Sequence, residues 1–318
     1  LLLWIPVREV RAWHRLQGAP GTQDLAAAWL REHMDTGSEV LATERYGPSL
    51  PWDRRDVVRA DPAFARMSPS QQRALLERPF VQMLHIPMYA LRVKLAEYYY
   101  DARNFLAYDW LVTSGAVRNR YLRERERFPR QAAFYDLLDE LLEPAWSIRP
   151  DGNTRGPAQI VYRLDDGFRT TVRERFGTRP VDHCLEVADD LHGPHVVNFV
   201  GGIARHAEFA ERWELAAFWY GVLARAARST GQQALGLERG GLACIQLGDL
   251  SRAREMFLAL EVHPEREIAA LGNLGYIAEL EGDADLAREY YDKVIARDRQ
   301  GEAGAWARTR RDALASPD

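Results

Sequence analysis

Lysine is almost absent from this sequence, although basic residues are common. Of the 42 basic residues only Lys94 and Lys293 are lysines, an imbalance that we attribute to the codon usage of a high-GC genome. The formal net charge is −4, so the chain lacks the excess of positive charge with which nucleic-acid-binding proteins neutralise phosphates. We therefore expect no nucleic-acid partner.

Cysteine and long apolar runs are scarce as well. Two cysteines in 318 residues exclude a disulfide scaffold, and Cys244 falls at a small-residue position where a buried thiol would act as a small hydrophobe. No stretch approaches the roughly 18 to 20 apolar residues of a membrane span, and the N-terminus lacks the features of a signal peptide. These absences predict a chain that is soluble apart from its first few residues.

The sequence also lacks a recognisable group of catalytic residues. Carboxylate pairs such as Asp165-Asp166 and Asp189-Asp190 fall in turns or on polar helix faces, beside nothing that would raise a pKa. Ser114 follows a predicted buried strand, where α/β folds often bind ligands, and a small-molecule site there is the alternative to a purely structural strand end. We predict no catalytic residue and no cofactor in this chain; if it belongs to an enzyme, the catalytic residues lie outside it.

One cluster has the residue types of a zinc site, because imidazole, thiolate and carboxylate groups are the ligands that zinc prefers in proteins. Its spacing matches no standard zinc pattern, and capping and surface hydrogen bonds explain the same residues. We therefore predict no metal, and retain as candidate ligands His183, Cys184, His192 and His195.

The C-terminal half contains an internal repeat. The segment GGLACIQLGDLSRAREMF, from Gly240, aligns with LGYIAELEGDADLAREYY, from Leu274, and every matched pair lies 34 residues apart. A fixed period of this length predicts stacked helical hairpins. The matched pairs are Gly241 and Gly275, Gly248-Asp249 and Gly282-Asp283, Ala253 and Ala287, and Phe257 and Tyr291.

The residue types at the matched positions indicate how such hairpins are built. Glycine at the first position lets the two helices of a hairpin approach closely, and the Gly-Asp pair ends the first helix and caps the second. The small alanine side chain lets the second helix pack closely against the first, and the aromatic residue fills the space between neighbouring hairpins. The pattern resembles the tetratricopeptide repeat; the alternative is a generic helical bundle. We assign repeat-packing roles to Gly241, Gly248, Ala253, Phe257, Gly275, Gly282, Ala287 and Tyr291.

A third, degenerate copy precedes these two repeats. The segment AERWELAAFWYGVLARAARS supplies Tyr220 at the position of Phe257, 37 residues earlier, and the three extra residues are expected in a loop at 229–231. After the last repeat, residues 302–314 are predicted to form a polar capping helix whose Trp306 packs inward. We place the whole array at residues 181–318.

The N-terminal half alternates predicted helices and strands. This order predicts a small three-layer α/β domain with a mostly parallel sheet, at residues 22–180. The fold class of the chain is therefore α/β plus all-α, with a short tetratricopeptide-like helical array after the α/β domain. Helices are expected at 22–34 and 70–77 and from 130 until shortly before Pro144, and strands at 39–44, 110–113 and 158–164.

Several short motifs follow one another in this half: a D-x-A-x-x-W-L helix from Asp24, a GSEVLATE segment from Gly37, a Y-D-W-L-V-T-S strand from Tyr108 and a final I-V-Y-R-L strand. Over residues 1–164 this order resembles the soluble tail of polytopic membrane glycosyltransferases of the dolichyl-phosphate-mannose protein mannosyltransferase superfamily. In that superfamily the acidic catalytic residues lie in loops between membrane helices, so the resemblance implies no catalysis by this chain. The matching positions are Asp24, Ala26, Trp29 and Leu30; Gly37, Ser38, Val40 and Glu44; Tyr108 to Ser114; Arg120, Tyr121 and Leu122; and Ile160 to Leu164.

The resemblance also implies a place for the first residues. In that superfamily the tail follows the last membrane helix on the extracytoplasmic side, so residues 1–21 are expected to be membrane-proximal and LLLWIPV to end a membrane helix. Interfacial tryptophans and nearby arginines fit this interpretation, whereas a buried first strand or helix is the alternative. The membrane-proximal side chains are Trp4, Arg8, Arg11 and Trp13.

These inferences give one preferred hypothesis and one alternative. The preferred hypothesis is a non-catalytic scaffold, the periplasmic or extracytoplasmic part of a membrane-anchored protein, which docks a partner protein of a membrane complex through its repeats. The alternative is a C-terminal accessory domain of a membrane glycosyltransferase that uses a lipid-linked sugar.

Overall fold

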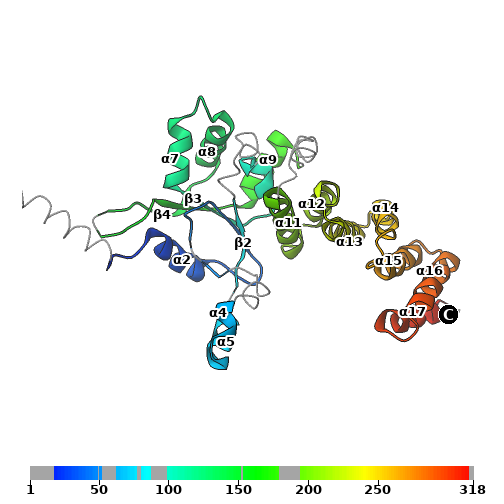
Figure 1. Cartoon of the computed structure of the whole chain (residues 1–318). Helices are drawn as coiled ribbons and strands as arrows, with labels where there is room; N and C mark the ends of the chain where they lie inside the picture. The colour runs from blue at the N-terminus through cyan, green and yellow to red at the C-terminus, as the bar shows by residue number, and fades with distance from the viewer. Residues whose placement is uncertain are drawn as a thin grey trace, which may run out of the picture. The chain divides into compact units, whose positions relative to one another are not determined.

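The computed structural model describes residues 18–48, 50–51, 62–76, 80–86, 99–151, 153–178 and 194–314. The chain divides into two compact units, Leu1–Pro180 and Val181–Asp318, and Figure 1 labels their helices and strands. The first unit contains a sheet with helices, and the second is entirely helical where it is described. The expected class, α/β plus an all-α array, is confirmed.

The first unit is built on a five-stranded sheet of order β2-β1-β3-β5-β4. β1 pairs in parallel with both β2 and β3, whereas β5 runs antiparallel to β3 and β4. The sheet is therefore mixed rather than mostly parallel. The strands are β1 (Val40–Thr43), β2 (Gln82–His85), β3 (Trp110–Ser114), β4 (Pro144–Ile148) and β5 (Gln159–Arg163).

The mixed pairing has a topological cause. β3, the helices after it and β4 form a crossover connection, so β4 runs parallel to β3, and β5 then returns between them. A return through a short connection makes β5 antiparallel to both neighbours. The sequence analysis missed β4 and β2 and so did not foresee where β5 would lie.

Helices cover both faces of the sheet and complete the three layers (Figure 1). Helix α2 packs Ala27 and Leu30 on the face that carries Leu41 and Val112. Gly21 is the residue before its first turn, and the Thr22 hydroxyl donates a hydrogen bond to the Pro157 carbonyl at 2.6 Å. The helices of this unit are α2 (Thr22–His33), α4 (Pro62–Ala65), α5 (Pro69–Leu76), the 3-10 helix η1 (Ala102–Phe105), α7 (Gly115–Arg123), α8 (Pro129–Leu141) and α9 (Asp166–Phe176).

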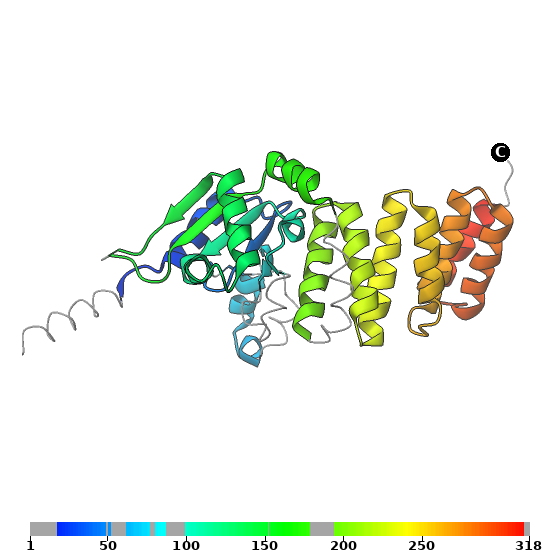
Figure 2. The same cartoon turned by 90° about the horizontal axis from the view of Figure 1, so that it is seen from above.

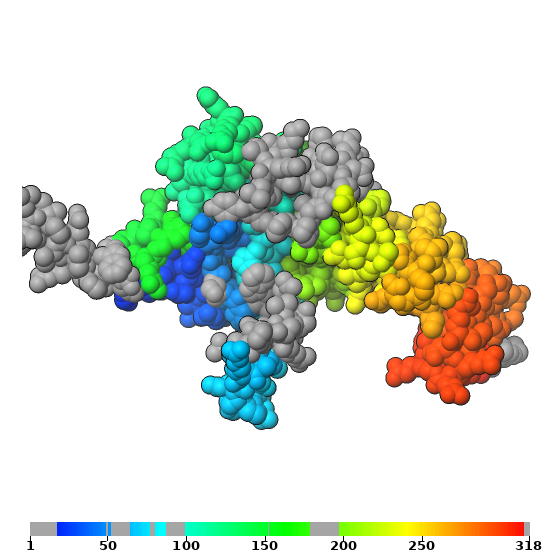
Figure 3. All heavy atoms as spheres, viewed as in Figure 1, coloured from blue at the N-terminus to red at the C-terminus, as the bar shows by residue number. Residues whose placement is uncertain are grey.

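The second unit is a row of helices in which each packs against its neighbours in sequence. Figure 2 shows them side by side, from green to red, and Figure 3 shows α13 to α17 as a continuous row of packed side chains. Thr230 and Gly231 belong to α13, so of the expected loop at 229–231 only Ser229 lies outside the helix. The helices are α11 (Pro194–Phe209), α12 (Trp213–Ala226), α13 (Thr230–Gln246), α14 (Leu250–Leu260), α15 (Glu267–Leu280), α16 (Ala284–Arg297) and α17 (Glu302–Ala313).

The two Gly-Asp turns of the repeats have the same geometry. Gly248 and Gly282 have φ angles of 75° and 80°, a left-handed conformation that glycine adopts without steric cost after a helix. The carboxylates of Asp249 and Asp283 then accept the backbone N–H three residues later, at 3.2 and 3.0 Å. Each dipeptide thus ends one helix and begins the next.

Candidate functional site

The two glycines that begin the repeat motif lie where the helices of each hairpin pack together. A Cβ atom at Gly241 of α13 would lie 2.7 Å from the Phe257 ring of α14, and one at Gly275 of α15 would lie 2.6 Å from the Tyr291 ring of α16. Neither distance leaves room for a methyl group. Both rings are fully buried, so each fills the space that the absent side chain leaves. Ala253 and Ala287 are buried beside them.

We expect Gly275→Ala to destabilise the second unit by about 1–3 kcal/mol, because the added methyl group overpacks a full core. Gly272→Ala, on the same helix, is the matched control. Its Cβ would meet the Trp306 ring at 3.4 Å, an ordinary contact, so the better helix propensity of alanine should leave stability unchanged or raise it by up to about 1 kcal/mol. Urea unfolding followed by circular dichroism measures both, and equal effects would contradict the proposed packing role of Gly275.

A further close contact between helices of the array involves a glycine that sequence analysis missed. A Cβ at Gly236 of α13 would lie 2.6 Å from the backbone nitrogen of Ala224 and 2.8 Å from the carbonyl oxygen of Tyr220, both in α12. This contact joins one hairpin to the next rather than the two helices of one hairpin. The repeat could not have revealed this contact, because the position 34 residues later is Ala270 and not a glycine. The one signal in the sequence was a glycine inside a predicted helix.

Two identical triads of polar side chains join the helices at both ends of the array. In the first, Glu208 of α11 accepts hydrogen bonds from the Tyr220 hydroxyl of α12 and from Arg239 of α13. In the second, Glu279 of α15 accepts from the Tyr291 hydroxyl of α16 and from Arg310 of α17. Each member of the second triad lies 71 residues after its counterpart. The same three residue types therefore connect three successive helices at two places in the array.

The middle hairpin lacks the triad because two of the three corresponding positions carry apolar residues. Ile245 and Phe257 stand where the flanking hairpins have glutamate and tyrosine. The two glutamates are 26% and 24% exposed, and a partly buried carboxylate that loses a donor is destabilising. Exchanging both residues for apolar ones avoids an unsatisfied carboxylate. Burial raises the pKa of the hydroxyls of Tyr220 and Tyr291, and the hydrogen bond that each donates to its glutamate raises it further.

A pocket of about 460 Å³ lies in the array at α15, α16 and α17. We call it the groove pocket. Trp306 of α17 is 44% exposed, so it packs inward less than the sequence predicted, and its ring meets that of Tyr291 edge-on, with centroids 5.5 Å apart. The residues that line the pocket are Glu265, Arg266, Ile268, Ala269, Gly272, Asn273, Val294, Ala303 and Trp306.

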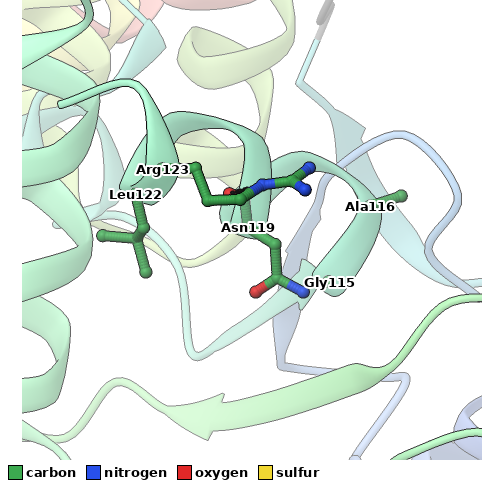
Figure 4. A pocket seen from close by; sticks show the side chains of 5 residues that line it. All are labelled: Gly115, Ala116, Asn119, Leu122 and Arg123. Carbon is green, nitrogen blue, oxygen red and sulfur yellow. Dashed lines mark hydrogen bonds between the residues drawn. The ribbon is translucent and has the colours of Figure 1, made fainter.

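The strand end at Ser114 is occupied by the protein itself. The Ser114 hydroxyl caps α7 by accepting the N–H of Ala116 at 3.3 Å, and its backbone N–H donates to the Glu44 carboxylate at 2.8 Å. Ser114 and Glu44 are 0% and 1% exposed, so neither contacts solvent. A shallow pocket of about 400 Å³ lies nearby on the outer face of α7 (Figure 4), where Asn119, Leu122 and Arg123 project from the helix.

Glu44 is the centre of a buried polar network between β1, β3 and α8. The Tyr135 hydroxyl of α8 donates a hydrogen bond to one carboxylate oxygen, while the Ser114 N–H occupies the other. Burial raises the pKa of Glu44 to about 7, although these two hydrogen bonds and the charge of Arg118 lower it. Arg118 itself donates to the Tyr162 hydroxyl at 2.7 Å and pairs with Asp139. The full burial of Glu44 makes it a structural group, with no access for a substrate.

Most of the remaining candidates lie outside the described residues. These are Trp4, Arg8, Arg11 and Trp13 of the membrane-proximal segment, and His183, Cys184 and His192 of the possible zinc cluster; His195 lies in the first turn of α11. In the part of the chain that is described, no group of three or more potential ligands could hold a metal ion, and no helix has the length and apolar character of a membrane span. Cys244 is a buried free thiol whose pKa is raised by burial.

Comparison with known proteins identifies one segment of the chain. Residues 268–300, which cover α15 and α16, match the tetratricopeptide repeat family. No protein of curated function matches the sequence, and no solved structure does. The match supports the tetratricopeptide-like character of the C-terminal part and suggests a protein-interaction module. It lends no support to the glycosyltransferase resemblance of the N-terminal half, which stays a prediction.

Proposed function

We propose that this chain is a non-catalytic scaffold that docks a partner protein through its helical repeats beside a membrane, on the extracytoplasmic side. The observation that carries the proposal is the pair of hairpins α13–α14 and α15–α16, which share their glycine contacts and Gly-Asp turns. Arrays of this kind bury a continuous core and offer an extended surface to other proteins. The groove pocket, with its half-exposed tryptophan, is the feature of that surface best suited to binding.

The membrane part of the proposal has a separate basis. It rests on the apolar residues 1–7 and on the tryptophans and arginines that follow them in the sequence. We expect the full-length gene product to sediment with membranes and to resist extraction by alkaline carbonate. We also expect protease to reach the repeats from the extracytoplasmic side of intact cells whose outer envelope has been opened. Recovery in the soluble fraction would count against anchoring, and protection from protease against the proposed side.

Docking is tested by affinity capture from cross-linked membranes of the source organism. The full-length protein should retain one partner protein at a near one-to-one ratio. The double variant Gly241→Leu, Gly275→Leu should lose that partner, because both substitutions separate helices that now touch. If the wild-type chain retains only further copies of itself, the docking function is wrong.

A second candidate function rests on the resemblance of residues 1–164 alone. In it, the chain is the C-terminal accessory domain of a membrane glycosyltransferase that uses a lipid-linked sugar, and it helps to position the acceptor protein. The sequence of the gene before the codon for Leu1 discriminates between the two functions. Many membrane helices with an acidic first loop would favour the transferase, and a single anchor would favour the scaffold.

A further inference from the structure

The groove pocket has an apolar interior that no side chain of the array fills. Ile268, Val294 and Trp306 contribute large apolar groups, and Gly272 lies against the Trp306 ring, which a Cβ at that position would meet at 3.4 Å. A volume of about 460 Å³ lies toward the lower end of the roughly 300–1,000 Å³ that is usual for ligand pockets. A single large apolar side chain of a partner protein suits this space, and such anchors dominate the energy of many protein interfaces.

The polar groups around this pocket are mainly acceptors. The carboxylate of Glu265 is exposed and forms no ion pair with any residue that the structure describes. Asn273 donates from its amide nitrogen to the carbonyl of Ala269 at 2.8 Å, which leaves its side-chain oxygen to accept. Arg266, the cation that lines the pocket, is paired with Glu238 at 2.9 Å. The uncompensated charge at the pocket is therefore negative.

We infer that the groove pocket binds a partner segment in which a large aromatic or aliphatic side chain is flanked by lysine or arginine. The apolar side chain packs on the exposed part of the Trp306 ring, beside Ile268, and the flanking cation meets Glu265. This inference rests on the proposed docking function and adds to it the chemistry of the partner. Opposite charge at the rim selects the partner and orients it, while the buried anchor supplies most of the affinity.

Three synthetic heptapeptides test the inference with the purified full chain. The first places tryptophan at the centre with lysine two residues away on each side; the second replaces both lysines by glutamate; the third replaces the tryptophan by alanine. We expect the first peptide to bind at least tenfold more tightly than either of the others, measured by fluorescence anisotropy at low salt. Equal binding of the first two peptides would overturn the charge assignment, and equal binding of the first and third would overturn the anchor.

Protein variants locate the binding. Trp306→Ala and Glu265→Lys should each weaken binding of the first peptide about tenfold, and Glu265→Lys should in addition improve binding of the glutamate peptide. The matched controls are Leu258→Ala and Glu255→Lys on α14, because Leu258 is 45% exposed against 44% for Trp306 and neither α14 residue lines the pocket. If the controls weaken binding as much as the pocket variants do, the site lies elsewhere and the inference is wrong.

Two checks separate this inference from the docking function and from misfolding. Glu265 is exposed, so Glu265→Lys should keep the helical circular dichroism of the wild type even if Trp306→Ala loses part of it. Capture of the natural partner should fall with both pocket variants. If capture persists in both while the peptides fail to bind, the docking function stands and the groove-pocket inference fails; if no partner is captured by the wild type, the docking function itself fails.

Discussion

Replacing Asp109 by alanine is expected to destabilise the first unit by about 3–5 kcal/mol, since it removes the buried counter-charge of a buried arginine. One carboxylate oxygen of Asp109 accepts a hydrogen bond from Arg169 of α9 at 2.7 Å, and the other accepts the backbone N–H of Val40 at 3.0 Å. The side chains of Asp109 and Arg169 are only 10% and 9% exposed. The substitution therefore removes a buried ion pair and frees the N–H that begins β1.

Asp166→Ala is the matched control, because Asp166 binds the same guanidinium from the solvent side. It pairs with Arg169 at 2.9 Å, but its side chain is 99% exposed. Exposed pairs contribute about 0–1 kcal/mol, so this variant should lie close to the wild type in urea unfolding. If the two variants lost similar amounts of unfolding free energy, burial would not determine how much an ion pair with Arg169 contributes to stability.

The second large effect is the loss, as the pH rises toward neutrality, of the stability that Glu44 contributes to the first unit. The pKa of Glu44 is about 7 in the folded chain, above its ordinary value of 4.5, because burial favours the protonated form. The folded chain therefore holds this proton more tightly than the unfolded chain does. The resulting stability is complete below pH 4.5 and is lost as the pH rises through 7, by roughly 3 kcal/mol in total.

Glu44→Gln isolates this effect, because glutamine has nearly the same shape and does not titrate. Burial lowers the pKa of His85 to about 4, so this group increases the stability of the first unit as the pH rises toward 6.5. Burial lowers the pKa of His206 to about 3, with the same direction of effect on the second unit. Their contribution is the same in wild type and variant and cancels in the difference. The stability of Glu44→Gln relative to the wild type should thus rise by roughly 3 kcal/mol between pH 4.5 and 8. Parallel pH profiles would contradict the assignment.

Tyr135→Phe provides a further test of the same carboxyl group. The variant removes a hydrogen bond that Glu44 accepts and that lowers its pKa, so the pKa of Glu44 should rise further. The pH at which the contribution of Glu44 to stability is lost should then move above 7. Infrared difference spectroscopy of the carboxyl C=O stretch follows the titration directly, and an unchanged midpoint would show that the tyrosine does not influence it.

Features that depend on neighbouring residues were predictable from the sequence. The dipeptides Gly248-Asp249 and Gly282-Asp283 combine a residue that tolerates positive φ with one that caps a helix, and both turns have that geometry. The spacing of Gly241 and Phe257 follows from the geometry of two helices joined by such a turn. Strand β3 was predictable for a similar reason, since a short apolar segment with a β-branched residue ended at Ser114.

Features that depend on distant residues were not predictable in this way. Strand β4 is a five-residue edge strand in which no residue is buried, and β2 is four residues long. The position of β5 between β3 and β4 follows from their pairing, not from its own residues. Trp306 was expected to pack inward, yet it is 44% exposed where it lies against Gly272 and Tyr291.

The sequence by itself determined that this chain carries helical hairpins with a 34-residue period, because that information lies in short segments that fold against their immediate neighbours. Only the tertiary structure decided that Glu44 becomes a buried acid, that glutamate, tyrosine and arginine meet in two triads, and that α15, α16 and α17 form a pocket. Those arrangements bring together side chains from two or three separate elements, and their charge and burial depend on how closely the elements pack.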